Sequence, residues 1–205
     1  MALILASGSP RRREILERAG IEFTVRAAEI DETARPGEAA ADYAKRLARE
    51  KALSVARSIA PGNLVLGADT VVVTAGHLLG KPRNDQDAAR MLRLLSGGTH
   101  YVVTGICLVR APDTVEALTH AASTVVFKPL AEAEIQSYIS TGEPLDKAGA
   151  YAIQGIGSKF VARVEGTYDN IVGLPIELVK EALRSAEGRT PGGAELARRN
   201  SCQRD

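Results

Sequence analysis

The stretch LILASGSPRRREILERAG, residues 3–20, begins with a short apolar run and passes through small residues into a charged, amphipathic segment. The run at residues 3–6 is continuously apolar, which is typical of a strand buried on both faces. Ser9 is a favourable N-cap, Pro10 suits the first turn of a helix, and Gly20 is a common C-terminal stop. These residues predict a buried strand, a tight turn and a short helix.

The same alternation of strands and helices continues along the chain. Apolar and alternating patterns predict strands over residues 23–27, 64–73, 101–109, 122–127 and 160–164, with a short return strand through Leu78 and Leu79. Helical spacing and end signals predict helices from Asp42 to Pro61, from Asn84 or Asp85 to Gly97, from Pro129 to Gly142, and from Pro175 onward. We therefore expect an α/β fold with a mixed central sheet and flanking helices.

The domain organisation is simple, because no repeat and no linker interrupts the chain. We expect a single domain over residues 1–186. From about Glu187 the sequence is rich in glycine and proline and then charged, which predicts a frayed or disordered tail over residues 187–205.

The composition excludes several classes of protein. The chain has 205 residues, 45% hydrophobic and 25% charged, which is enough for a core and unlike a disordered chain. A net charge of +1 argues against a non-specific nucleic-acid binder, and the aromatic content of 4% argues against a base-stacking platform. Two cysteines are too few for a disulfide scaffold or a cysteine zinc site. We expect no nucleic-acid partner.

Targeting and membrane segments are also absent from the pattern of the sequence. The apolar N-terminal run is too short for a signal peptide, and no stretch approaches the roughly 20 apolar residues of a membrane span. We expect a soluble, cytoplasmic protein with no membrane partner.

The turn SGSPRR at residues 7–12 is a candidate anion site. A small-residue turn before a helix leaves several backbone N–H groups unpaired at the positive end of the helix dipole. Arginines in the first turn of a helix oppose that dipole, and their position is explained if a phosphate binds there. Ordinary capping with solvated arginines explains the motif equally well.

Two charged residues fall where apolar side chains are expected. Helical spacing puts Lys51 between Leu47 and Val55, so Lys51 either snorkels to solvent or holds an anion in a cleft. Asp69 interrupts an otherwise apolar strand, which is costly unless the carboxylate is paired, binds a metal or moves a proton. Asp69 could instead end the strand at a turn, although the valines at 71–73 indicate that the strand continues.

Two further stretches have no regular pattern. Asp31 and Glu32 follow the second predicted strand and, taken alone, fit solvated loop acids. Residues 145–157 are rich in glycine and alanine without a helical or alternating period, yet they are too apolar for a surface loop. This stretch is not a dinucleotide-binding turn, because Phe160 stands where the third glycine is required and no strand precedes it. A P-loop motif is absent as well.

Eight ordered blocks resemble the Maf family of nucleoside triphosphate pyrophosphatases, and the resemblance extends to about residue 186. The blocks are SGSPRR at 7–12, DE at 31–32, REKA at 49–52, GADT at 67–70, KP at 81–82, SGGTHYVVTG at 96–105, PLDKAGAYAIQG at 144–155 and VGLP at 172–175. One departure is Gly80, where relatives frequently carry a glutamate.

The resemblance implies a fold and a reaction. The fold is an elongated, two-lobed α/β structure similar to the inosine-triphosphatase architecture, with a deep cleft between the lobes, and it is commonly found as a homodimer. The reaction is hydrolysis of a nucleoside triphosphate between the α and β phosphorus atoms, which releases pyrophosphate. The implied biological role is cleansing of the nucleotide pool, with a possible link to cell-division arrest.

The resemblance also implies site residues. Asp69 is the implied proton acceptor, and Glu32 and Asp69 are the carboxylates available for Mg²⁺ or Mn²⁺. The implied base-reading residues are Arg12, Thr70 and Gln154, which match the subfamily that acts on dTTP and UTP. The groups expected at the triphosphate are Ser7, Ser9, Arg11, Arg12, Lys51 and Lys81.

Two alternatives remain beside the hydrolase. A non-catalytic nucleotide-binding regulator of septum formation would use the same cleft, although pure binding does not need the pair Glu32 and Asp69. A nucleotidyl transferase could use similar cationic turns, but the motifs in the second half of the chain disfavour it.

Overall fold

A seven-stranded mixed sheet organises the computed structural model of the protein, which describes residues 1–188. The strand order is β2-β1-β3-β5-β6-β7, and β4 pairs with β3. Both neighbours of β1 are parallel to it, and the other pairings are antiparallel. The strands are β1 (Leu3–Leu5), β2 (Thr24–Val25), β3 (Leu64–Thr74), β4 (His77–Leu79), β5 (Thr99–Arg110), β6 (Thr114–Phe127) and β7 (Val161–Glu165).

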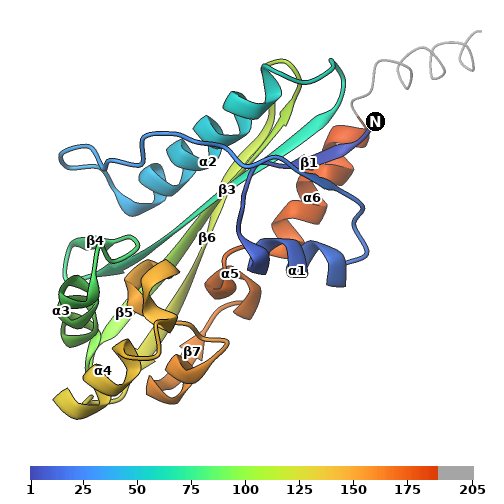
Figure 1. The fold of residues 1–205 in the computed structure, drawn as a ribbon. Helices are drawn as coiled ribbons and strands as arrows, with labels where there is room; N and C mark the ends of the chain where they lie inside the picture. Colours follow the sequence, from blue (N-terminus) through green and yellow to red (C-terminus); the bar gives the residue numbers. More distant parts are fainter. Residues whose placement is uncertain (189–205) are drawn as a thin grey trace, which may run out of the picture.

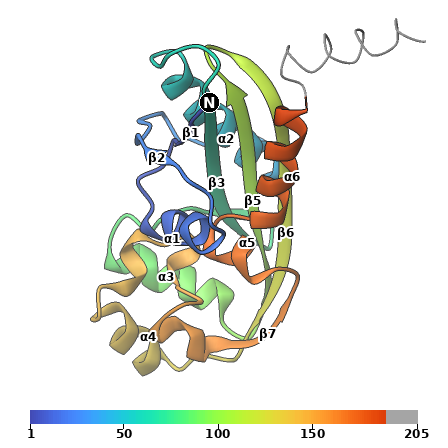
Figure 2. The same cartoon turned by 90° about the vertical axis from the view of Figure 1, so that its right-hand side faces the viewer.

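Helices flank the sheet in two groups (Figures 1 and 2). The helices are α1 (Pro10–Arg18), α2 (Ala40–Ala56), α3 (Asp85–Leu95), α4 (Glu132–Ile139), α5 (Tyr168–Val172) and α6 (Ile176–Glu187). We call β1, β2, α1, α2 and α6 the first lobe, and β4, α3, α4 and β7 the second lobe. The long strands β3, β5 and β6 run through both lobes (Figure 2). The α/β class, the mixed sheet, the flanking helices and the two lobes are as predicted.

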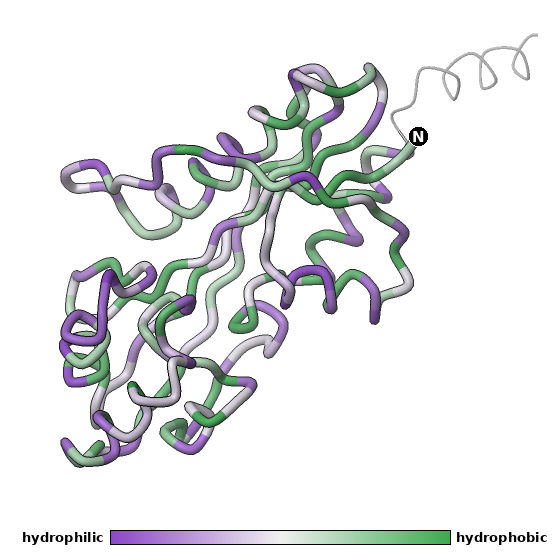
Figure 3. Tube along the Cα trace, viewed as in Figure 1, coloured by the Kyte–Doolittle hydropathy of each residue, from purple (hydrophilic) through white to green (hydrophobic). Residues whose placement is uncertain are grey.

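Each lobe has its own hydrophobic core. In the first lobe, Leu5, Leu16 and Leu66 pack with residues of α6 on one face of the sheet. In the second lobe, Leu92, Tyr138 and Phe160 belong to a separate cluster between α3, α4 and the sheet. The tube coloured by hydropathy shows that the hydrophilic first turn of α1 comes shortly after the apolar strand β1 (Figure 3). The two cores leave the polar residues to gather between the lobes.

The helix α2 lies unusually close to the sheet, and two glycines explain this. A Cβ atom on Gly67 would lie 2.0 Å from the carbonyl oxygen of Ala48, and one on Gly105 would lie 2.4 Å from that of Ala44. Gly105 is the cross-strand partner of Asp69 in β5, and Gly67 stands two residues before Asp69 on the same face. The glycines therefore bring the backbone of α2 directly over the strand that carries Asp69.

Several boundaries differ from the sequence prediction. β6 begins at Thr114 rather than at 122, because its first half is paired to β5 although none of its side chains is buried and its polar and apolar residues do not alternate. β2 covers only two exposed residues of the predicted strand 23–27. α2 runs from Ala40 to Ala56 instead of starting at Asp42 and reaching Pro61. α5 was not predicted, since five residues are too few to show helical periodicity.

The C-terminal boundary agrees with the sequence only in part. α6 ends at Glu187, so the first residue assigned to the predicted tail is still helical. The rest of that tail, residues 189–205, lies outside the described residues, and the predicted disorder stays a prediction. Within the described part of the chain, none of the helices combines the length and the apolar character needed to cross a membrane.

Candidate active site

A pocket of about 270 Å³ opens between the two lobes. Residues from the β1–α1 turn, α2, β3, the stretch after β4 and the irregular segment 146–154 line it. The structure brings all ten sequence-predicted site residues to this one pocket: Ser7, Ser9, Arg11, Arg12, Glu32, Lys51, Asp69, Thr70, Lys81 and Gln154.

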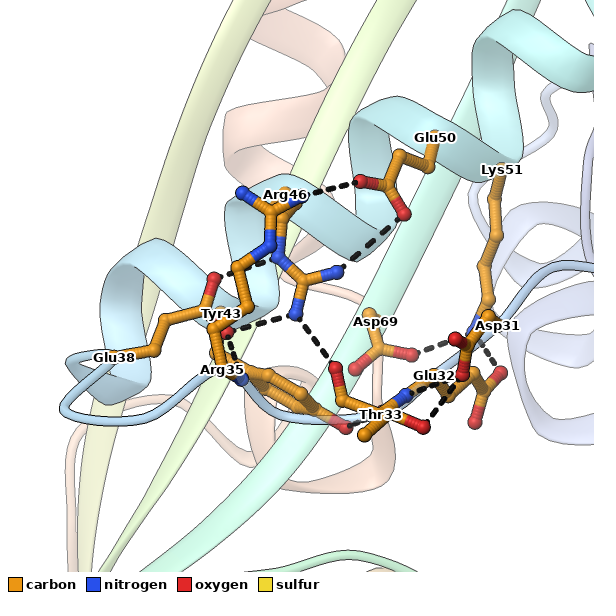
Figure 4. Close-up of polar contacts among 10 residues, drawn as sticks. All are labelled: Asp31, Glu32, Thr33, Arg35, Glu38, Tyr43, Arg46, Glu50, Lys51 and Asp69. Carbon is orange, nitrogen blue, oxygen red and sulfur yellow. Dashed lines mark hydrogen bonds and ion pairs between the residues drawn. The ribbon is translucent and has the colours of Figure 1, made fainter.

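Lys51 and Asp69 form a buried ion pair in the wall of the pocket. Lys51 Nζ lies 2.6 Å from Asp69 Oδ1 and 2.6 Å from Glu32 Oε1 (Figure 4). Lys51 and Asp69 are 8% and 7% exposed, whereas the side chain of Glu32 is about half exposed. Lys51 therefore does not snorkel to solvent, and β3 continues past Asp69 to Thr74, so Asp69 does not end a strand.

The charge state of Asp69 reflects this environment. Burial raises the pKa of its carboxyl group, and the positive charges of Lys51 and Arg12 counteract only part of that effect. Partial burial raises the pKa of Glu32, but the hydrogen bond and ion pair with Lys51, together with the charges of Lys81 and Arg12, outweigh it, so that the pKa is lowered. The carboxyl groups of Asp69 and Glu32, which both contact the Lys51 ammonium, thus differ in pKa, and Asp69 binds a proton more readily than Glu32.

Glu32 reaches Lys51 on a loop that α2 holds in place (Figure 4). Tyr43 Oη donates a hydrogen bond to the backbone carbonyl of Glu32 at 2.9 Å. Arg46 binds both carboxylate oxygens of Glu38 at 2.6 and 2.7 Å and the carbonyl of Thr33 at 3.1 Å. The bond from Arg46 lowers the pKa of Glu38 to about 2. The loop is therefore fixed at Glu32 itself and on its C-terminal side, at Thr33 and Glu38.

Asp31, the neighbour of Glu32 in the sequence, lies outside the pocket wall. Its carboxylate accepts hydrogen bonds from the backbone N–H of Thr33 at 2.9 Å and from the Thr33 hydroxyl at 2.6 Å. Asp31 is exposed and is not part of the pocket wall. The solvated-acid interpretation thus fits Asp31, while Glu32 joins the site.

Arg12 connects three parts of the site. Its Nε donates to the carbonyl of Gly173 at 2.8 Å, Nη1 to Ser7 Oγ at 3.0 Å and Nη2 to Thr70 Oγ1 at 3.1 Å. These bonds use three of the five N–H donors of a guanidinium. Burial lowers the pKa of Arg12, and the nearby Asp69 offsets part of that shift. Arg12 thus links the β1–α1 turn to β3 and to the segment after α5.

The β1–α1 turn is built as the sequence predicted, with one informative detail. Ser9 is the N-cap of α1 and Pro10 its first residue, but the Ser9 side chain makes no capping hydrogen bond. Ser7 Oγ instead accepts from the Ser9 backbone N–H at 3.3 Å. Ordinary side-chain capping therefore does not account for the serines of this turn.

The remaining cations and the amide lie toward the rim. Arg11 Nη1 is 3.6 Å from Asp146 Oδ2, a contact that crosses from the first lobe to the segment 143–150. Lys81 and Gln154 are exposed and line the pocket. Residues that the sequence reasoning left unassigned also line it, among them Asp146, Lys147, Tyr151 and Gly173. The only signal for Asp146, Lys147 and Tyr151 was their place in the block PLDKAGAYAIQG.

The carboxylates fit one kind of metal site. Within residues 1–188 no group of three or more His, Cys, Asp and Glu side chains could hold a metal ion. Glu32 and Asp69 nevertheless converge on one cation, the Lys51 ammonium, at 2.6 Å each. Mg²⁺ commonly binds one or two carboxylates and takes its other ligands from water and substrate phosphates. The donor set fits a metal that arrives with a phosphorylated substrate and does not fit a metal held by protein side chains alone.

Comparison with known proteins identifies the family. The profile of the family described as "Maf-like protein" matches residues 2–186. The chain belongs to the Maf family. A protein of Anaeromyxobacter sp. (strain Fw109-5), named dTTP/UTP pyrophosphatase, is 52% identical over 195 residues, which cover 94% of this chain and 93% of that protein. A Hahella chejuensis protein of the same name is 54% identical over 176 residues, 85% of this Maf chain and 87% of that one.

Among solved structures, a nucleoside-triphosphatase (dITP/XTP pyrophosphatase) from Mycobacterium abscessus aligns with the Maf chain at 16% identity and a TM-score of 0.42. The alignment covers 93% of this chain and 98% of the other. The family resemblance stated from the eight sequence blocks is confirmed by the family profile and by the curated relatives.

Proposed function

We propose that this Maf-family chain is a nucleoside triphosphate pyrophosphatase that hydrolyses dTTP and UTP to the monophosphate and pyrophosphate. The observation that carries the proposal is the buried pair of Lys51 and Asp69, joined by Glu32, in a pocket whose wall also carries arginines. The two relatives, which bear this activity in their names at 52% and 54% identity, support it.

The cations of the pocket are suited to a triphosphate, which carries three or four negative charges. Arg11 and Lys81 can both bind a phosphate. Arg11 would exchange its contact with Asp146 for the phosphate, and the exposed Lys81 would exchange solvent for it. The N-terminus of α1, which Ser9 caps, adds the positive end of a helix dipole to the same wall of the pocket. Arg12 is held by three protein partners and supplies a fixed positive charge beside them, whereas the Lys51 ammonium can turn from the two carboxylates toward a phosphate.

The reaction needs an acceptor for the proton of the attacking water, and we assign this role to Asp69. The water oxygen forms a bond to the α-phosphorus, the bond from that phosphorus to the bridging oxygen breaks, and pyrophosphate leaves with the bonding electrons. The water proton passes to the carboxylate of Asp69. Before metal and substrate bind, Lys51 holds Asp69 Oδ1 and orients the acceptor. Burial, which raises the pKa of Asp69, makes it a better base.

A divalent cation, Mg²⁺ or Mn²⁺, would be held by Glu32 and Asp69 and would neutralise charge on the phosphate oxygens. Lys51 occupies the position between the two carboxylates and would have to shift toward the phosphates to share the site. Its flexible four-carbon stem allows such a shift without movement of α2.

Base recognition is assigned to Arg12, Thr70 and Gln154. Thr70 accepts from Arg12 and is hydrogen-bonded to Thr104 at 3.0 Å, so its hydroxyl is held in one place. The amide of Gln154 offers one donor and one acceptor side, which complement the carbonyl and N3–H of thymine or uracil. Thymine and uracil differ by one methyl group, worth about 1–3 kcal/mol in a pocket, so acceptance of both is expected.

The test is pyrophosphate release from a panel of the eight common nucleotides with Mg²⁺ or Mn²⁺. The proposal expects turnover of dTTP and UTP above that of the purine nucleotides, and loss of turnover with a chelator. A chain that binds nucleotides without turnover would fit the alternative, a non-catalytic regulator of septum formation. Transfer of the nucleotidyl group to an acceptor other than water would contradict hydrolysis.

The wider setting follows from the family resemblance rather than from the site. We propose a homodimer that works in the cytoplasm, removes dTTP, UTP and modified pyrimidine nucleotides from the pool, and is linked in this way to cell-division arrest. Light scattering measures the dimer. Nucleotide pools in cells that lack the protein measure the cleansing role.

A further inference from the structure

The irregular segment 152–157 is held by two side chains that approach it from outside the pocket. Glu143 Oε1 accepts the backbone N–H of Gly157 at 3.0 Å, and Glu143 Oε2 accepts that of Ile156 at 3.0 Å. Tyr138 Oη donates to Glu143 Oε1 at 2.8 Å and accepts the N–H of Ala152 at 3.1 Å. The segment is therefore bonded at both of its ends, and residues 153–155 lie between the two attachment points.

The four hydrogen bonds of Glu143 and Tyr138 to each other and to residues 152–157, which we call the clamp, lie in close packing. A Cβ atom on Gly155 would lie 2.6 Å from Glu143 Oε2, and one on Gly157 would lie 2.6 Å from Tyr138 Oη. Tyr138 is fully buried, and its ring packs edge-on against Phe160 with 5.1 Å between ring centroids. Ile153 packs against the cores of both lobes. The backbone on either side of Gln154 is thus fixed by specific contacts.

The charge state of Glu143 suits this role. Burial alone would raise the pKa of its carboxyl group, but the two backbone N–H groups and the Tyr138 hydroxyl lower it below the ordinary value. A carboxylate accepts hydrogen bonds on both oxygens, whereas an amide or a protonated acid would turn a donor toward one of the N–H groups. Only the ionised form satisfies all three donors.

We propose that Glu143 and Tyr138 are positioning residues that set base specificity by fixing Gln154. The inference rests on the proposed function, in which Gln154 reads the base. A side-chain amide that can turn by 180° exchanges its donor and acceptor and then complements cytosine as well as uracil. The position from which the amide meets the base is set by the backbone of Gln154, and the hydrogen bonds of Tyr138 and Glu143 fix that backbone on both sides, at Ala152 and at residues 156–157. Loss of these bonds lets the amide meet the base from other positions, in which cytosine is accepted as well.

The experiment compares Glu143→Gln and Tyr138→Phe with two controls, one on α4 and one on β5. Glu132→Gln removes a carboxylate bound to Arg93 and Gln136, and Tyr101→Phe removes the hydroxyl of an exposed tyrosine. For each protein, kcat/KM is measured with dTTP, UTP and CTP. Glu143→Gln is also measured in a Gln154→Ala background, and amide hydrogen exchange is followed across residues 152–157.

We expect the preference for dTTP and UTP over CTP to fall about tenfold in Glu143→Gln and less in Tyr138→Phe, with the controls unchanged. In the Gln154→Ala background, Glu143→Gln changes the preference by less than about twofold, because both act through one amide. Exchange at Ile156 and Gly157 becomes faster in Glu143→Gln only.

Three outcomes contradict the inference and differ from one another. An equal loss for all three nucleotides, or an additive loss in the Gln154→Ala background, assigns Glu143 to stability alone and leaves the proposed function intact. Unchanged exchange at Ile156 and Gly157 shows that the clamp does not hold the segment. A wild-type protein without turnover of dTTP and UTP contradicts the proposed function itself, and this inference with it.

Discussion

Lys51 Nζ and Asp69 Oδ1 are 2.6 Å apart, and both side chains are about nine-tenths buried. The pair exists because glycines in β3 and β5 let α2 lie directly on the sheet, so that a lysine on the inner face of the helix reaches the strand below. A buried ion pair stabilises a protein little in itself, but loss of one partner leaves an uncompensated charge. Function is thus the better explanation for this pair than stability.

Replacement of Asp69 by asparagine tests its assignment as the proton acceptor. Asparagine keeps the size of the side chain but cannot take the water proton at neutral pH. We expect kcat for dTTP to fall by about two to four orders of magnitude, the usual contribution of a positioned acid–base group. Pyrophosphate release at saturating dTTP measures the effect, and a thermal melt verifies the fold. Turnover close to that of the wild type in a folded variant would contradict the role of Asp69.

The two pocket lysines are expected to differ in stability. Lys81→Ala removes an exposed cation, so the melting temperature stays unchanged while kcat/KM for dTTP falls. Lys51→Ala leaves the carboxylate of Asp69 buried without its partner and lowers the free energy of unfolding by about 3 kcal/mol. Urea denaturation of both variants measures the difference. The double change of Lys51→Met with Asp69→Asn should recover most of the lost stability, and failure to do so would assign Lys51 a packing role.

Arg46 is expected to affect the metal requirement without touching the substrate. It binds Glu38 with two hydrogen bonds and the carbonyl of Thr33 with a third, and so holds the loop that carries Glu32. Arg46→Met releases that loop and should raise the Mg²⁺ concentration for half-maximal activity about tenfold, as is common when the support of a metal ligand is removed. Arg93→Met, which breaks the exposed pair with Glu132, is the matched control. An equal effect of both variants would refute the prediction.

The parts of the molecule that the sequence predicts are those with a period or a strong local signal. The β1–α1 unit follows from an apolar run, a serine and a proline, and Lys51 was placed on the inner face of α2 by helical spacing alone. The first half of β6 is not predicted, because none of its side chains is buried and exposed apolar residues such as Val115 and Leu118 stand among the polar ones, so the apolar alternation is lost. The segment 145–157, which has no period, stands out by its composition, but only the family resemblance predicts a role for it.

The long-range contacts of the site could not be predicted in this way. Glu32 reaches Lys51 because Tyr43 and Arg46 hold its loop through hydrogen bonds between residues 11 and 13 positions apart in the sequence. Glu143 binds the backbone of Gly157, and a bond to a backbone N–H leaves no trace in side-chain chemistry. Such contacts form only when separate segments pack together in the folded protein, and local sequence patterns do not predict that packing.

His100 gives the protein a pH-dependent stability. The ring is fully buried, its Nε2 is 2.9 Å from Tyr151 Oη, and burial lowers its pKa to about 4. The unfolded chain takes up a proton near pH 6.5, which the folded chain does not bind until about pH 4. The contribution of His100 to the free energy of unfolding is therefore constant above about pH 6.5. It falls by about 3 kcal/mol in total as the pH decreases toward 4.

The variant His100→Gln, which does not titrate, should show a flatter dependence of the unfolding free energy on pH over that range. Urea denaturation at several pH values measures it, with His120→Gln as the control because His120 is an exposed residue of β6. An unchanged slope in His100→Gln would mean that other groups cause the loss of stability in acid.

Gln154 lies exposed at the rim of the pocket, on a segment whose irregular backbone gives it no structural reason to carry an amide. If the amide faces the base, Gln154→Glu keeps the size of the side chain, removes its donor and adds a negative charge beside the pyrimidine carbonyl oxygens. An unpaired polar edge costs about 1–3 kcal/mol, and charge repulsion adds to it, so kcat/KM for dTTP and UTP should fall at least about tenfold. CTP should lose less, since its exocyclic amine can donate to the new carboxylate. Steady-state kinetics with the three nucleotides decide the matter: an equal loss for all three would show that Gln154 shapes the pocket and does not read the base.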